Sequence, residues 1–141
     1  MKKLVFLLLA VMMLTACGQD KENDQGAGYV NITAEEAKQI MDTEEDYIIL
    51  DVRTQEEYDQ GHIPNAILIP DTEIKNKAEE VMTDKDQLIL VYCRSGRRSA
   101  NAAGKLADIG YKCVNLKGGI LAWKEANMPV ITSEQDIIIQ R

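Results

Sequence analysis

The stretch LILVYCRSGRRSA, residues 88–100, joins an apolar run to a loop of arginine, serine and glycine. The run QLILVYC (87–93) is short and apolar, which predicts a buried strand ending at Cys93, the longest strand of the chain. The alanine-rich segment 99–109 predicts a helix, with Gly110 at its carboxyl-terminal cap. The stretch therefore places a thiol where a central strand stops.

Similar strands and helices alternate on both sides of this stretch. Short apolar runs predict further strands at 29–32, 47–52, 66–70 and 113–116. Capping boxes beginning at Thr33 and Thr54 predict one helix to about residue 41 and a second that stops by Gly61. Asp71 is expected to cap a helix over 72–82, and a last helix is expected over 120–126.

Strands separated by helices require crossover connections. The sequence therefore predicts an α/β fold with a mainly parallel central sheet and helices on both faces. Ligands bind such sheets beyond the carboxyl ends of the strands. Cys93 lies at such an end, so we expect the site there.

The N-terminus has the pattern of a targeting segment. A basic start is followed by an unbroken apolar run over 4–14, too short to span a bilayer, and LTAC (14–17) resembles the lipobox of bacterial lipoproteins. The resemblance implies a signal peptide over 1–16, cleavage before Cys17, a lipid on its sulfur and an anchor on the extracytoplasmic face of the cell membrane. A plain secretory signal is the alternative.

The remaining chain divides into a tether, one domain and a tail. Residues 17–28 are polar and glycine-bearing, typical of a flexible tether, residues 29–131 form the expected domain, and 132–141 the tail. Loss of residues 1–16 leaves 14 basic and 23 acidic residues, a formal charge of −9. This charge argues against nucleic acid as a partner.

The loop after Cys93 favours an anionic sulfur. Unpaired amides at the start of the following helix, a turn at Gly96, and the charges of Arg94, Arg97 and Arg98 all stabilise a thiolate. We therefore expect the pKa of an accessible Cys93 to lie below its ordinary value and the basic residues to hold an anionic substrate. The alternative is a small apolar cysteine that ends a strand.

Three segments together resemble the single-domain rhodanese family of sulfurtransferases. ILDVRTQEEYDQGHIPNAILIP (49–70) resembles its Asp-Val-Arg and Gly-His-Ile-Pro signature, VYCRSGRRSANAAGKLADIGY (91–111) its active-site loop and helix, and VNLKGGILAWKEANMPV (114–130) its Gly-Gly-x-x-x-Trp ending. The match covers about residues 29–131 and implies a rhodanese-like fold.

The resemblance implies sulfur transfer through a Cys93 persulfide. A donor such as thiosulfate gives its outer sulfur to Cys93, and cyanide, a thiol or a protein thiol then removes it, without a metal or cofactor. The loop that holds the substrate and the persulfide consists of Arg94, Ser95, Gly96, Arg97, Arg98 and Ser99. Phosphatases and arsenate reductases of related architecture use the longer C-x5-R loop, whereas position 99 is Ser here.

Several other residues are candidates for supporting roles. His62 is either the base of a Cys-His dyad or, as in the turn it resembles, a structural residue with one ring nitrogen bound to backbone. Asp51 either touches the loop or accepts local N–H bonds. Arg53 and Glu57 are spaced to pair with each other. Trp123 is expected in the core or a pocket wall rather than as a substrate platform.

Three further expectations concern backbone and thiols. Asn65 and Asn127 stand where the family commonly has glycine, so we expect a left-handed backbone at both. A disulfide between Cys93 and Cys113 is not expected, because a helix of roughly 16 Å separates them and a bridge needs Cα atoms within about 7 Å.

Two functions are compatible with these residues beside the phosphatase alternative. The first is an extracytoplasmic sulfurtransferase that turns over a small anionic sulfur donor. The second is a module of the same fold that binds an anion or carries a persulfide and delivers sulfur to a protein partner.

Overall fold

The structure, a computed structural model, describes residues 28–139 and contains one parallel sheet in that range. The strand order is β1-β5-β4-β2-β3, and every neighbouring pair is parallel. The strands are β1 (Tyr29–Ile32), β2 (Tyr47–Asp51), β3 (Ile67–Leu68), β4 (Leu88–Tyr92) and β5 (Lys112–Leu116). The predicted α/β class is confirmed.

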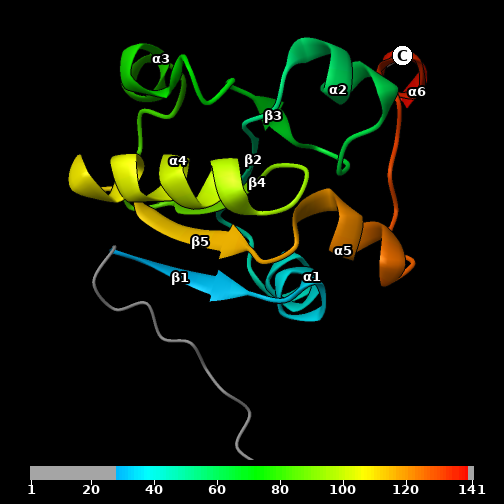
Figure 1. The fold of residues 1–141 in the computed structure, drawn as a ribbon, viewed down its shortest axis with the longest axis horizontal. Helices are drawn as coiled ribbons and strands as arrows, with labels where there is room; N and C mark the ends of the chain where they lie inside the picture. Colours follow the sequence, from blue (N-terminus) through cyan, green and yellow to red (C-terminus); the bar gives the residue numbers. More distant parts are fainter. Residues whose placement is uncertain (1–27, 140–141) are drawn as a thin grey trace, which may run out of the picture.

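Helices cover both faces of this sheet (Figure 1). Their bounds are α1 (Ala34–Thr43), α2 (Gln55–Gln60), α3 (Ile74–Val81), α4 (Arg97–Asp108), α5 (Gly119–Glu125) and α6 (Ser133–Ile139). Helices α3 and α4 bury their apolar side chains against one face, and α1 and α5 against the other. Helices α2 and α6 lie beside each other near the β3 edge.

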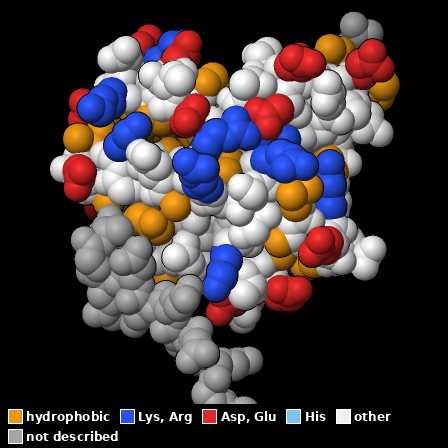
Figure 2. Space-filling view, viewed as in Figure 1, with side chains coloured by type: hydrophobic (Ala, Val, Ile, Leu, Met, Phe, Trp, Pro, Cys, Tyr) orange, Lys and Arg blue, Asp and Glu red, His pale blue; other side chains and the backbone are white. Residues whose placement is uncertain are grey.

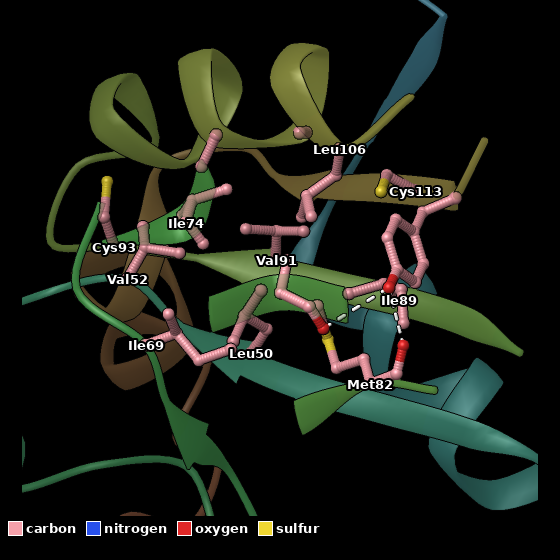
Figure 3. Packing of buried hydrophobic residues seen from close by; sticks show 14 residues of the cluster. Leu50, Val52, Ile69, Ile74, Met82, Ile89, Val91, Cys93, Leu106 and Cys113 are labelled. Carbon is pink, nitrogen blue, oxygen red and sulfur yellow. Dashed lines mark hydrogen bonds between the residues drawn. The ribbon is translucent and has the colours of Figure 1, made fainter. Parts of the chain in front are cut away.

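Strand β4 is buried on both faces because it lies in the middle of the sheet. Leu90 and Tyr92 point into the cluster under α1 and α5, whereas Ile89 and Val91 point into the cluster under α3 and α4. Side chains alternate along a strand, so Cys93 continues the second set. Figure 3 shows it at one end of that cluster.

The two predicted capping boxes and the two predicted left-handed residues are confirmed. Thr33 and Thr54 both accept a bond from the amide three residues on, and the glutamate there bonds back to the threonine amide. Asn65 and Asn127 have φ values of 65° and 57°, which is the predicted left-handed backbone.

Several predicted element bounds and lengths differ from those in the structure. The strand expected over 66–70 is only Ile67–Leu68, because it is an edge strand and Pro70 has no N–H to give. Asp71 is not a helix cap: a turn in which the Glu73 amide donates to the Pro70 carbonyl at 2.8 Å delays α3 to Ile74. Strand β4 is also no longer than β2 or β5, at five residues each.

The structure describes most of the C-terminal segment but little of the chain before the domain. Segment 132–141, expected as a tail, contains α6, which packs on α2. The expected signal peptide, Cys17 and most of the tether lie outside the described residues. Within residues 28–139, no helix has the length and hydropathy needed to cross a membrane.

Candidate active site

The loop after β4 turns back on its own cysteine. Gly96 adopts a left-handed φ of 95°, so α4 begins at Arg97, two residues earlier than predicted. The Gly96 amide donates to the Cys93 sulfur at 3.1 Å, and the Ser99 hydroxyl donates to it at 3.3 Å. The expected inward-facing amide is therefore present, and Ser99 adds a second donor.

These hydrogen bonds explain the ionisation of the thiol. Burial raises the pKa of Cys93, but the bonds from the Ser99 hydroxyl and from the amides of Ser99, Gly96 and Ser95 together bring that pKa below its ordinary value. The predicted direction is confirmed. The groups that stabilise the thiolate most are hydrogen-bond donors close to the sulfur. From the sequence, the charges of the arginines were also expected to contribute.

The start of α5 hydrogen-bonds to the backbone of the cysteine loop. The Ile120 amide donates to the Cys93 carbonyl at 2.9 Å. Gly119 permits this approach, because a Cβ there would collide with the Arg94 carbonyl. Gly96 is also confined, though less tightly, since its Cβ would lie 3.0 Å from the Gly118 nitrogen. The Gly-Gly turn thus fixes the shape of the cysteine loop.

The expectation that Cys93 is accessible is wrong for this conformation, because its exposed fraction is 1%. Its side chain points into the cluster under α3 and α4, and the loop folds over the sulfur. A reagent therefore reaches the sulfur only after the groups that cover it move.

The arginines have different partners from those predicted. Arg98 donates to both oxygens of Glu57, at 2.9 and 2.7 Å, and so connects α4 to α2. Arg98 also holds the pKa of Glu57 down to about 2. Arg53 instead pairs with Asp51, Nη2 to Oδ2 at 2.7 Å, so the expected pair of Arg53 with Glu57 is not formed.

Asp51 belongs to a buried hydrogen-bond network with Arg53 and Tyr92. It accepts from the Arg53 amide at 3.0 Å and from the Tyr92 hydroxyl at 2.6 Å. Arg53 also donates to the Gly61 carbonyl at 2.7 Å, and Tyr92 accepts from the Ile63 amide at 3.1 Å. Asp51 thus orders nearby backbone, the second of its two predicted roles. The role of Tyr92 was not predicted, because a single tyrosine within an apolar run gives no local signal of such a partner.

His62 and Trp123 also make structural contacts. His62 Nδ1 lies 2.8 Å from the Tyr58 carbonyl oxygen, and Nε2 lies 2.6 Å from Asp136 of α6. The prediction of a ring nitrogen bound to backbone is confirmed, and neither ring nitrogen bonds to Cys93. Trp123 is buried, and its Nε1 donates to the Pro129 carbonyl at 2.8 Å.

Two hollows flank the loop. The smaller, about 170 Å³, includes Arg94, Lys124 and Leu121 in its lining. The larger, about 480 Å³, includes Arg97, Arg98 and Lys105. Figure 2 shows Lys and Arg side chains gathered in a band across this face. Anions approaching the loop therefore meet positive charge, although the whole chain has a formal charge of −7.

Cys113 lies at the opposite end of the α3 and α4 cluster from Cys93 (Figure 3). Both cysteines are free thiols, as expected. Burial raises the pKa of Cys113 to about 12. Of these two thiols, only Cys93 has an environment that favours the thiolate.

Comparison with known proteins gives a consistent result. Residues 33–126 match the model of the rhodanese-like domain family. A protein of Allochromatium vinosum named sulfurtransferase is 38% identical over 104 residues, 73% of this chain and 95% of the relative. Thiosulfate sulfurtransferase PspE of Escherichia coli is 38% identical over 82 residues, 58% and 76% of the two chains. A solved rhodanese-related protein of Thermoplasma volcanium superposes with a TM-score of 0.65 at 34% identity, covering 72% and 96%.

Proposed function

Because the chain belongs to the rhodanese-like domain family, we propose that it is a sulfurtransferase of the thiosulfate type, with Cys93 as the catalytic residue. The Cys93 thiolate attacks the outer sulfur of thiosulfate; the sulfur–sulfur bond of the donor breaks, and sulfite leaves with its electron pair. An acceptor thiolate or cyanide then attacks the outer sulfur of the persulfide and restores the Cys93 thiolate. Neither step requires a metal or another cofactor.

The hydrogen bonds to the Cys93 sulfur are the observation that supports this proposal most directly. Donors from Gly96 and Ser99 stabilise negative charge on that sulfur, and they suit a persulfide anion at the same place. The name of the PspE relative supports thiosulfate as the donor. Because Cys93 is 1% exposed, the mechanism includes movement of the groups that cover its sulfur before the donor arrives.

The test measures sulfur loading and turnover separately. The purified protein is incubated with thiosulfate, with and without cyanide. The mass of the peptide that contains Cys93 is then measured, and the thiocyanate formed is assayed. We expect one added sulfur on Cys93 and thiocyanate production, both absent in Cys93→Ser and retained in Cys113→Ser. No added sulfur and no thiocyanate from the native protein would exclude the proposal.

The burial of Cys93 supports one second candidate, a persulfide carrier that serves a protein partner. A shielded persulfide is protected from small thiols and released when a partner opens the loop. Loading by a donor without turnover to cyanide or small thiols, combined with transfer to a protein thiol, distinguishes the carrier from the enzyme.

We also propose that the protein acts outside the cytoplasm, anchored to the membrane by a lipid on Cys17. The motif LTAC after a short apolar run supports this location. In cells fed a labelled fatty acid, the native protein should take up label and sediment with membranes, and Cys17→Ala should do neither. Label that persists in Cys17→Ala would contradict the proposed attachment.

A further inference from the structure

Asn115 is a polar residue buried in the sheet near the cysteine loop. It lies on β5 between its register partners, Val91 of β4 and Asn31 of β1, and its exposed fraction is 3%. Side chains alternate along a strand, so Asn115 faces the same side of the sheet as Cys113, the side on which α4 packs. Burial separates its carboxamide from water, so the carboxamide depends on hydrogen bonds within the protein.

The Asn115 carboxamide donates two hydrogen bonds. Its Nδ2 donates to Asn31 Oδ1 at 2.8 Å and to the Gly96 carbonyl at 3.3 Å. Within residues 28–139, its Oδ1 is the only buried side-chain nitrogen or oxygen without a hydrogen-bond partner. The reverse orientation of the carboxamide would place Oδ1 against the Gly96 carbonyl, which can only accept. An unpaired buried acceptor is unfavourable, so this arrangement holds a donor on Gly96 at a cost in stability.

Gly96 connects Asn115 to the reactive sulfur. The Gly96 amide donates to the Cys93 sulfur at 3.1 Å, and the Gly96 carbonyl accepts from Asn115 and from the Ala100 amide. Glycine has the widest choice of backbone angles, so contacts outside the residue must fix the direction of its N–H group. Asn115 supplies such a contact from the sheet, at the carbonyl end of the same residue.

We propose that Asn115 is a positioning residue for Cys93. By fixing the Gly96 carbonyl, it keeps the Gly96 N–H group directed at the sulfur, where that group stabilises the thiolate and the persulfide. The inference rests on the proposed sulfur transfer, and Asn115 acts through Gly96 rather than on the sulfur itself. The competing role for Asn115 is to join β5 to β1 through Asn31.

The test is the rate of Cys93 alkylation by iodoacetamide as a function of pH in Asn115→Leu, which has a similar size and no carboxamide. The midpoint should rise by about 0.5–1 pH unit, a part of what one complete hydrogen bond to a charged group contributes. Below the midpoint, alkylation should therefore be about three- to tenfold slower than in the native protein.

A urea titration of the same variant separates positioning from folding. The urea midpoint should not fall, because the substitution removes the unpaired acceptor and the Gly96 carbonyl keeps its bond from the Ala100 amide. A lower urea midpoint with an unchanged pH midpoint would show a role in folding alone and overturn the proposal. Asn115→Val removes the same carboxamide with a side chain that strands favour, and it decides the question if the leucine variant does not fold.

The matched control is Asn31→Val. It removes the other acceptor of Asn115 and leaves the bond to the Gly96 carbonyl in place. The pH midpoint of this control should equal that of the native protein. A shift as large as that of Asn115→Leu would assign the effect to the pairing of β1 with β5 and exclude the positioning role.

Sulfur loading distinguishes this inference from the proposed function. With thiosulfate as the donor, Asn115→Leu should load Cys93 more slowly by the same factor as it is alkylated. If thiosulfate places no sulfur on the native protein, sulfur transfer fails, whereas the alkylation midpoints still decide the role of Asn115. If the native protein is loaded and its alkylation midpoint equals that of Asn115→Leu, the positioning role alone is excluded.

Discussion

Removal of one hydroxyl, in Ser99→Ala, should raise the pKa of Cys93. Ser99 is fully buried, and its hydroxyl donates to the Cys93 sulfur at 3.3 Å. The Gly96 amide, at 3.1 Å, is unchanged by the substitution. The variant therefore tests one donor while the backbone of the loop remains in place.

The size of the effect follows from the strength of a hydrogen bond to a charged group. Such a bond contributes about 1.5–3 kcal/mol, and one pKa unit corresponds to about 1.36 kcal/mol, so the pKa of Cys93 should rise by about one to two units. The thiolate stabilises the fold above the pKa of a free thiol, and this contribution is lost as the pH falls through the lowered pKa of Cys93. Ser99→Ala should reduce that gain at high pH.

The assay is the rate of Cys93 alkylation by iodoacetamide as a function of pH, read by mass spectrometry so that Cys113 is counted separately. Ser95→Ala is the matched control, because the Ser95 hydroxyl has no hydrogen bond with a described residue and only its amide acts on Cys93. We expect the midpoint to move in Ser99→Ala alone. Equal midpoints in the two variants would refute the assignment of Ser99 as a thiolate donor.

Three other substitutions test the framework of the site. The carboxylate of Glu57 stabilises the fold above its ordinary pKa of 4.5, and this contribution is lost as the pH falls to about 2. The difference in urea midpoint between the native protein and Glu57→Gln should therefore disappear over that interval. A difference that does not change with pH would contradict the pairing of Glu57 with Arg98. Asn127→Ala should cost about 1 kcal/mol in a urea titration and Asn127→Gly far less, because alanine resists the positive φ; equal losses would exclude backbone strain as the cause. Gly119→Ala should lower the free energy of unfolding by about 2 kcal/mol or more, because the added Cβ collides with the Arg94 carbonyl. Its control, Gly104→Ala in α4, adds a Cβ that meets only ordinary contacts and should raise the free energy of unfolding by about 0.5–1 kcal/mol. Similar results for both would show that the Gly-Gly turn is not confined.

Local sequence rules worked where both partners lie within a few residues. The capping boxes at Thr33 and Thr54 involve residues three apart, and both are formed as predicted. The left-handed φ of Asn127 depends on the backbone of one residue. The same rules failed at Asp71, because a turn after Pro70 competed with the cap. The position of α4 was also wrong, since Gly96 turns the chain directly into the helix.

The sequence by itself determined the α/β alternation, the place of Cys93 after the central strand, and a loop whose amides turn toward the sulfur. These features depend on periodicity, glycine and helix ends, which act over short stretches of chain. Only the tertiary structure decided which charges pair and whether the thiol is exposed. Arg98 meets Glu57 across 41 residues and His62 meets Asp136 across 74, so neither contact follows from spacing. The burial of Cys93 likewise depends on how α3 and α4 pack over the sheet, which is a property of the assembled core.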